Sequence, residues 1–350
     1  MGQLRAGAVS TRREVHVVVP DDIDDPTTPS GGNVYDRRLC EELSRSGWTV
    51  RELTVPGEPG DSLAGVLADV PGGAVALVDG LVAVAAPHAM LRESSRLRLV
   101  VLLHMPFGER DPDLRARERQ VLAATTAVVT PSGWSRRWVL RHYGLRPWSV
   151  HAAPPGVDPA DLTTGSEAGT RLVCVAAVTR DKGHDVLLAA LAEVADLSWQ
   201  LTCVGSLSKD RRVAASAQRA AVAHGIDDRV TWAGAVSREE LAKVCAQADA
   251  LVLASRAESW GMVVTESLAR GVPVIATEVG GLPEALGSSA AGLLVPAGDV
   301  PAMAGALRRW LEDERLRNDL RLAARSRRTT LTGWPLTAAR VATVLDEVSR

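Results

Sequence analysis

Short apolar runs rich in valine and leucine recur roughly every 20 to 30 residues, each followed by a Gly- or Ser-rich turn and a helical pattern. This order is typical of parallel strands buried between covering helices. In the first half of the chain, strands are expected at 14–20, 49–55, 74–79, 99–104, 127–131 and 149–153. The expected helices include 33–46 and 135–143, the latter with Ser132 or Ser135 as its N-cap.

Residues 154–169 interrupt this pattern with three prolines, three glycines and small polar residues, as is typical of a linker. The strand and helix order then restarts. Further strands are expected at 171–179, 199–205, 230–232, 250–254, 273–277 and 292–295. Further helices are expected at 184–195, 209–224, 238–248, 262–270 and from 300 onward.

The sequence therefore predicts an α/β protein with two doubly wound domains, residues 1–156 and 157–333. A last helix at about 334–350 could cross back to pack on the first domain. Ligands of open parallel sheets bind at the carboxyl ends of the strands, where helix N-termini present free N–H groups. Two such domains face to face would form a ligand-binding cleft.

Composition narrows the function classes. The net charge of −2 leaves no basic excess, so no nucleic-acid partner is expected. Four cysteines lie far apart without C-x-x-C spacing and are expected to be buried and reduced. The N-terminus shows no secretory signal, and the longest apolar stretch, 70–89, contains Pro-Gly-Gly and Asp79, which predicts a turn and strand pair rather than a membrane span. A cytoplasmic location is therefore expected.

The most informative segment runs from Glu258 to Glu266, two acids that bracket an expected strand-to-helix turn. If the helix begins near Met262, both carboxylates point toward its N-terminus. The free N–H groups of Gly261, Met262 and Val263 suit phosphate oxygens, whereas the carboxylates suit the hydroxyls of a sugar. The alternative is that both acids simply favour a helix N-terminus.

This E-x7-E spacing, with glycine three positions after the first Glu and A-R-G-V-P-V-I-A after the second, resembles the retaining glycosyltransferases of family 4. That family has the GT-B fold of two facing Rossmann-like domains with parallel sheets. The resemblance covers nearly all of the chain, up to G-L-L-V-P-A-G-D at 292–299. It implies that Glu258 contacts the donor hexose and that Glu266 binds the ribose hydroxyls. The Ala- and Arg-rich composition is typical of a high-GC genome, so an actinobacterial source is expected.

A second match to the family joins the first strand of the second domain to its helix, in the segment Thr-Arg180-Asp-Lys182-Gly183. In the family an arginine and a lysine here clamp the donor diphosphate, which implies this role for Lys182. Family members usually carry the arginine five residues before that lysine, where this chain has Ala177. Arg180 would have to substitute from a different backbone position. Solvated cations at a helix start are the alternative for both side chains.

Gly31 and Gly32 follow the first expected strand, where glycine lets the backbone approach a phosphate closely. The resemblance implies that this pair touches the donor phosphate and shapes the acceptor side. His104 ends an apolar strand, and family members often carry histidine there beside the reacting sugar. The alternative for His104 is a structural role.

The resemblance also implies that backbone groups of Ala235 and Val236 meet the nucleobase. An ordinary capped turn, with Ser237 and Glu240 forming a capping box, is the alternative, and both can hold together. An acidic run precedes the Gly31 loop and is expected to be solvated rather than metal-binding. It consists of Asp21, Asp22, Asp24 and Asp25.

The family implies metal-independent, retaining transfer of a hexosyl group from a nucleotide-diphospho-sugar, with UDP- or GDP-sugar as the expected donor and no cofactor. The acceptor would be a hydroxyl group of a lipid, a natural product or a polyol. Basic stretches at 92–98 and 115–119 could favour an anionic lipid surface at the inner face of the membrane, and solvated helices explain them equally well. The alternatives are another GT-B activity, such as a sugar phosphorylase or a nucleotide-sugar epimerase, or a non-catalytic nucleotide-sugar-binding paralogue.

Overall fold

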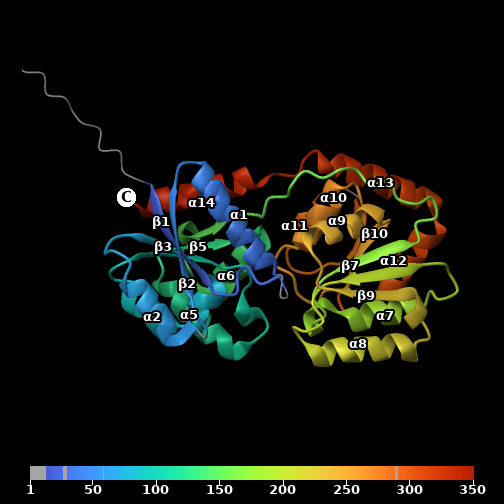
Figure 1. The fold of residues 1–350 in the computed structure, drawn as a ribbon, viewed down its shortest axis with the longest axis horizontal. Coiled ribbons are helices and arrows are strands. Elements are labelled where there is room, and N and C mark those ends of the chain that lie inside the picture. The colour runs from blue at the N-terminus through green and yellow to red at the C-terminus, as the bar shows by residue number, and fades with distance from the viewer. Residues whose placement is uncertain (1–12, 27–29, 58, 288–290) are drawn as a thin grey trace, which may run out of the picture.

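Two six-stranded parallel sheets organise the chain, as Figure 1 shows for this computed structural model. It describes residues 13–26, 30–57, 59–287 and 291–350. The first sheet has the order β2-β1-β3-β4-β5-β6. Its strands are β1 (Glu14–Pro20), β2 (Thr49–Val55), β3 (Val75–Asp79), β4 (Arg98–Leu102), β5 (Ala127–Thr130) and β6 (Val150–Ala152).

The second sheet has the order β12-β11-β10-β7-β8-β9. Its strands are β7 (Arg171–Val175), β8 (Gln200–Val204), β9 (Val230–Gly234), β10 (Ala250–Leu253), β11 (Val274–Thr277) and β12 (Gly292–Val295). In each sheet the chain adds strands first toward one edge and then, from the middle, toward the other edge, as is typical of a doubly wound fold. The predicted fold class, two Rossmann-like α/β domains with parallel sheets, is confirmed.

Helices cover both faces of the first sheet. Along β1, Val15, Val17 and Val19 pack into one apolar cluster and Val18 into another, as the period of two in a strand requires. The first cluster lies under α1 (Gly31–Arg45) and α14 (Trp334–Val348). The opposite face carries α2 (Pro59–Ala68), α3 (Gly80–Ala85), α4 (Pro87–Glu93), α5 (Pro112–Ala124) and α6 (Gly133–Tyr143).

A single large apolar cluster fills the second domain. Trp199 and Trp310 are its largest fully buried side chains. The helices around it are α7 (His184–Ala192), α8 (Arg211–Ala223), α9 (Arg238–Gln247), α10 (Met262–Ala269), α11 (Leu282–Leu286), α12 (Val300–Glu312) and α13 (Glu314–Arg328).

The last helix belongs to the first domain. In Figure 1 the chain leaves α13 and returns so that α14 lies beside α1, and Trp334 is buried in the cluster between α1, α14 and the sheet. The chain therefore passes between the domains twice. The two passages touch, because the Val157 N–H donates to the Thr332 carbonyl at 3.0 Å.

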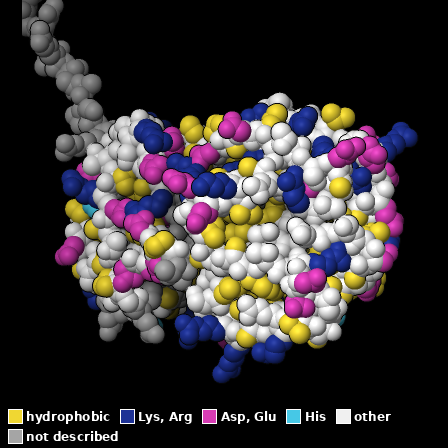
Figure 2. Space-filling view, turned by 45° about the vertical axis from the view of Figure 1, so that its right-hand side comes forward, with side chains coloured by type: hydrophobic (Ala, Val, Ile, Leu, Met, Phe, Trp, Pro, Cys, Tyr) yellow, Lys and Arg dark blue, Asp and Glu magenta, His cyan; other side chains and the backbone are white. Residues whose placement is uncertain are grey.

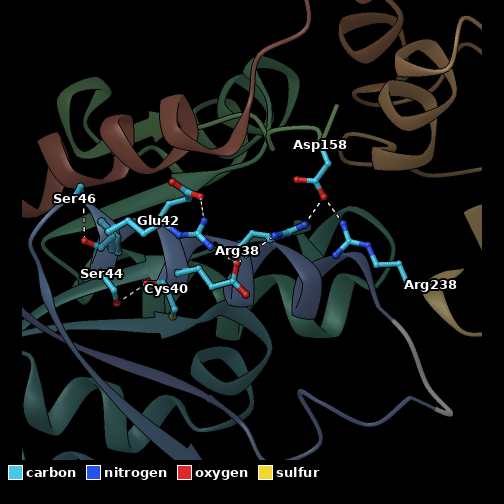
Figure 3. Close-up of polar contacts among 10 residues, drawn as sticks. Arg38, Cys40, Glu42, Ser44, Ser46, Asp158 and Arg238 are labelled. Carbon is cyan, nitrogen blue, oxygen red and sulfur yellow. Dashed lines mark hydrogen bonds and ion pairs between the residues drawn. The ribbon is translucent and has the colours of Figure 1, made fainter. Parts of the chain in front are cut away.

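An arginine from each domain meets at the first passage. Asp158 accepts hydrogen bonds from Arg38 on α1 and from Arg238 at the start of α9, both on the same carboxylate oxygen (Figure 3). The linker is thereby tied to both domains by charge-assisted hydrogen bonds, which are stronger than neutral ones.

Several predicted elements end elsewhere in the structure. The strand expected over 171–179 stops at Val175, because the next residues turn into the short 3-10 helix η3 (Arg180–Lys182). In the apolar stretch 70–89 the predicted turn and strand are present as the Pro71–Gly73 turn and β3, but the stretch then continues into α3, which Asp79 caps through its side chain, and α4. Ser132, and not Ser135, is the N-cap of α6.

Acidic and basic side chains are interspersed over the face shown in Figure 2, as expected for a chain with a net charge of −2. Within the described ranges, no helix combines the length and the apolar character that a membrane crossing requires.

Candidate functional site

The residues singled out from the sequence gather where the carboxyl ends of the two sheets face each other. Gly31 begins α1 in the first domain, and Met262 begins α10 in the second. A Cβ built on Gly31 would lie 3.7 Å from the Met262 Sδ atom, and Met262 packs against the first-domain apolar cluster. The N-termini of α1 and α10 are therefore in contact across the domain boundary.

A glycine pair shapes the loop before α10. Gly281 donates its N–H to the Glu258 carbonyl at 2.8 Å, and a Cβ on Gly280 would lie 1.7 Å from that oxygen. Gly261 has a φ of 87°, and a Cβ there would meet the Leu282 Cδ2 atom at 2.4 Å. Only glycine fits such close approaches. Gly261 was predicted from the sequence, but the Gly280–Gly281 pair was not, although it follows a buried strand just as the Gly31–Gly32 pair does.

Lys182 and Glu258 form an ion pair, with the Lys182 Nζ atom 2.5 Å from the Glu258 Oε2 atom. Lys182 is held in place because Gly183 follows it in a left-handed conformation, so close to β10 that a Cβ would lie 2.0 Å from the Ala254 carbonyl. The Arg180 side chain is exposed, and its guanidinium has no hydrogen bond or ion pair among the described residues. Of the two predicted cations, Lys182 is thus the one in contact with a predicted acid.

Arg256 fixes the turn that carries both cations. Its guanidinium donates to the two Asp185 carboxylate oxygens at 2.9 and 2.6 Å and to the Arg180 carbonyl at 2.8 Å. This bidentate contact lowers the pKa of Asp185. Arg256 was not predicted as a site residue, although its position after a buried strand and two residues before Glu258 was a usable signal.

Glu266 lies on α10 and is half-buried. Its carboxylate has no hydrogen bond among the described residues, and burial raises its pKa while Arg270 and Arg238 oppose that rise. The Met262 and Val263 N–H groups have no partner within the helix, as at any helix start, and Gly261 offers no side-chain cap. This end of α10 thus presents unused donors and an acceptor to a ligand.

Ala235 and Val236 lie in the turn between β9 and α9, at the edge of the second sheet. The capping box behind them is confirmed. Ser237 Oγ accepts from the Glu240 N–H at 3.2 Å, and Glu240 Oε2 accepts from the Ser237 N–H at 3.0 Å. The capping box fixes the conformation of the turn. The contact of the Ala235 and Val236 backbone groups with a nucleobase stays a prediction, because a capped turn and this contact can coexist.

His104 follows β4 and lies directly under the Gly31–Gly32 turn. A Cβ on Gly32 would lie 3.0 Å from the His104 Cδ2 atom, so the imidazole fills the space that a side chain there would need. The His104 Nε2 atom lies 2.8 Å from Asp36 Oδ1 and 3.5 Å from Asp79 Oδ2. His104 was predicted from the sequence as a site residue, whereas neither Asp36 nor Asp79 was.

The three side chains shift one another's protonation. Burial lowers the pKa of His104, but Asp36 and Asp79 outweigh this and raise it overall. Burial, reinforced by Asp36, raises the pKa of Asp79 to about 6, against the opposing effects of His104 and of the Leu81 and Val82 N–H groups. The cluster therefore favours a charged histidine.

The ligand-type atoms of Asp36, Asp79 and His104 all lie within 4.8 Å of one another. The 2.8 Å separation between His104 and Asp36 is that of a direct hydrogen bond, so we interpret the group as a hydrogen-bonded cluster rather than a metal centre. In the acidic run before Gly31, Asp24 is bound to Arg37, and Asp21 accepts from the Gly57 N–H. The absence of a functional metal stays a prediction.

Further contacts join the domains around this site. Glu284 of α11 accepts from the Gly133 N–H and from the Arg137 guanidinium, both at 2.8 Å. Arg110, after β4, pairs with Asp181 in η3. Two cavities, of about 410 and 780 Å³, lie elsewhere and are lined by none of the predicted site residues.

Comparison with known proteins places the chain among enzymes of one kind. The model of glycosyl transferases group 1 matches residues 165–327, and that of Glycosyltransferase Family 4 matches residues 75–161. The D-inositol 3-phosphate glycosyltransferase of Pseudarthrobacter chlorophenolicus is 32% identical over 260 residues, which cover 68% of this chain and 60% of that protein. The protein of the same name from Arthrobacter sp. is 30% identical over 277 residues, covering 71% and 65%. The match thus spans less than two thirds of either relative.

Solved structures share the fold. Sucrose-phosphate synthase from Thermosynechococcus elongatus superimposes with a TM-score of 0.80 at 22% identity, covering 96% of this chain and 99% of that one. Anabaena HepE in complex with UDP and glucose superimposes with a TM-score of 0.76 at 15% identity, covering 96% and 100%. At these identities the likeness concerns the fold alone.

Proposed function

Because this chain belongs to the family 4 glycosyltransferases with the GT-B fold, we propose that it transfers a hexosyl group from a nucleotide-diphospho-sugar to a hydroxyl acceptor with retention of configuration. The observation that carries the proposal is the Lys182–Glu258 ion pair beside the uncapped start of α10. The loop and helix at 258–266 carry two carboxylates and free N–H groups, and η3 brings the Lys182 cation against them. This combination suits a ligand that has both phosphates and sugar hydroxyls.

In this proposal the groups divide their roles by charge. The Met262 and Val263 N–H groups and Lys182 bind the diphosphate and stabilise the negative charge that grows on it as the glycosidic bond breaks. Glu258 accepts hydrogen bonds from the hexose, and Glu266 accepts them from the ribose. The leaving phosphate takes the proton of the acceptor hydroxyl, so that no protein nucleophile or metal enters the reaction.

Domain contact supports the same proposal. Gly31, in the first turn of α1, lies against Met262 at the start of α10. A donor bound at α10 would therefore lie under the first domain, which would exclude water from the reactive sugar. The acceptor would then approach from the side of Gly31, Gly32 and His104. Ala235 and Val236 would meet the base, and Arg180 would add a second cation once a diphosphate is present.

The UDP-bound HepE structure supports a nucleotide-sugar donor and makes UDP-sugars the first candidates, and the names of the curated relatives support glycosyl transfer. The acceptor class, a cytoplasmic location and an association with a membrane surface stay predictions. A non-catalytic paralogue is the second candidate, since Ala177 stands where the family has its arginine and the Arg180 guanidinium is unpaired among the described residues.

The test is a calorimetric screen of UDP-, GDP-, ADP- and dTDP-sugars against the protein and its Glu266→Ala variant without added metal. We expect one donor to bind the wild type and to bind the variant about tenfold more weakly, because a charge-assisted contact to ribose is lost. Equal affinity of both proteins would refute the ribose assignment. Single-turnover cleavage of the bound donor then separates an enzyme from a binding protein, and phosphate-dependent cleavage without a nucleotide would identify a phosphorylase.

A further inference from the structure

Two carboxylates converge on one nitrogen of His104. Asp36 comes from α1 and Asp79 from the end of β3, and both face the Nε2 atom at 2.8 and 3.5 Å. The Nδ1 atom has no hydrogen bond with any described residue, and the His104 side chain is 20% exposed. One side of the imidazole is thus fully engaged by protein, and the other is left for a ligand.

The position of Asp36 is unusual for its residue type. It lies on the buried stripe of α1 together with Tyr35, Leu39, Cys40 and Leu43, and it is 2% exposed. A carboxylate on an apolar helix face destabilises the fold unless it is paired. Its described hydrogen-bond partner is His104, so this contact offsets the cost of burying the acid.

Asp79 has a second task that fixes its orientation. Its Oδ1 atom accepts from the Leu81 and Val82 N–H groups at 2.8 and 3.1 Å and so caps α3. Its Oδ2 atom is left to face His104. Because the cap fixes the orientation of the carboxylate, its second oxygen is directed at the imidazole.

We propose that Asp36 and Asp79 are positioning residues that hold His104 as an imidazolium whose Nδ1–H donates to an oxygen of the bound substrate. This inference rests on the proposed function for the identity of the substrate, a nucleotide sugar or its acceptor. The physical reason is that one carboxylate would orient a neutral imidazole, whereas two carboxylates at the same nitrogen favour the positive ring. A hydrogen bond from a charged donor is about twice as strong as one from a neutral donor.

The other groups around His104 do not cancel this effect. The Tyr35 ring meets the imidazole edge-on at 5.2 Å, its hydroxyl donates to the Ala153 carbonyl, and burial keeps that hydroxyl protonated by raising its pKa. The charge of Arg340 on α14 opposes the rise in the pKa of Tyr35 and is not among the causes of the pKa shift of His104. The charges that face the ring are therefore those of Asp36 and Asp79.

The sign of the pH effect follows. The raised pKa of His104 means that the imidazolium is present below that pKa and is lost as the pH rises through it. Removing one carboxylate lowers this pKa, so the imidazolium is lost at a lower pH. Asp79, with a pKa of about 6, adds its negative charge only above that pH. The cluster is thus complete between the pKa of Asp79 and that of His104.

The test is an NMR titration of the His104 ring resonances in the full chain and in the isosteric variants Asp36→Asn and Asp79→Asn. An asparagine at position 79 still caps α3, so that variant removes charge and keeps the helix start. We expect the His104 pKa to fall by about one unit or more in each variant, as removal of an adjacent opposite charge requires. The matched control is Asp24→Asn, which removes a carboxylate that is bound to Arg37, the neighbour of Asp36 on α1. This variant should leave the pKa of His104 unchanged.

A wild-type His104 that titrates at or below the ordinary histidine pKa overturns the proposal, as does an unchanged pKa in both variants. Broadening of the His104 resonance by micromolar Mn²⁺ would also overturn it and identify a cation site. These outcomes do not depend on catalysis, so they stay distinct from a failure of the proposed transferase activity. Where transfer is measured, the two variants should shift the alkaline limb of the pH profile of kcat to lower pH and leave the donor KM within about twofold. If the two carboxylates had a purely structural role, the variants would lower the melting temperature without moving that limb.

Discussion

Replacing Lys182 with methionine removes the charge opposite Glu258 and keeps most of the aliphatic stem. The Lys182 and Glu258 side chains are 28% and 19% exposed, so water still reaches the pair. An ion pair of this kind contributes about 0.5–1 kcal/mol to folding. The melting temperature should therefore fall by only about 1–4 °C.

The expected effect on turnover is much larger. If Lys182 contacts the diphosphate, the variant loses a charge-assisted hydrogen bond that is worth about 1.5–3 kcal/mol in the transition state. Since 1.4 kcal/mol corresponds to a factor of ten, the rate of transfer should fall roughly 10- to 150-fold. The assay is release of free nucleotide from the donor that the calorimetric screen selects, at saturating donor and acceptor.

Lys243→Met is the matched control, because Lys243 is exposed on α9 and should tolerate the same substitution. Turnover of Lys182→Met within about twofold of wild type would refute the placement of this cation at the reacting phosphate. A fall in melting temperature beyond about 10 °C would instead show that the ion pair holds the loop together.

Three further changes test separate parts of the site. Gly261→Ala should destabilise the protein by about 1–3 kcal/mol, since its φ is 87° and a Cβ would lie 2.4 Å from Leu282; thermal unfolding measures this, and Gly305→Ala, in a helix with open space around it, should be neutral or stabilising. Glu284→Ala should raise the donor KM about fivefold, because two contacts between the domains are lost, and small-angle X-ray scattering should show a larger radius of gyration. His104→Ala should impair transfer and leave nucleotide affinity intact in calorimetry.

Each of these has a result that would contradict it. Equal melting temperatures for the Gly261 and Gly305 variants would mean that the loop relaxes around a methyl group. An unchanged scattering curve for Glu284→Ala would mean that other contacts keep the domains together. Normal transfer by His104→Ala would return this histidine to a structural role.

The strand pattern could be predicted closely from the sequence, because most strands are short runs rich in apolar or β-branched residues that end in polar residues or turns. The bounds of β1, β2 and β12 agree residue for residue with the prediction. Where apolar residues continue past a strand the prediction fails. Residues 176–178 extend the apolar run of β7 past the end of the strand into the bend before η3, although the Ala176 and Val178 N–H groups still donate to the carbonyls of Val204 and Ser206. Helix α3 is apolar throughout, so its start is marked only by Asp79.

Some residues of the candidate site could likewise be predicted from the sequence, and others could not. Lys182 and Glu258 were identified separately, from motifs at two strand ends, and the structure brings them into contact. Asp36 could not be found because one acid in a helical pattern says nothing about what lies across from it. Its partner His104 is 68 residues away, and only the order of the strands brings the two together.

The double passage between the domains also determines how force travels through the molecule. Both described chain ends, at β1 and α14, belong to the first domain, and Arg13 is tied to Asp346 at 2.9 Å. A pull on the two ends would shear α14 from its neighbours before any load reached the second domain. The adjoining passages near Val157 and Thr332, joined to each other by a hydrogen bond, are the covalent connections through which load would then reach the second domain.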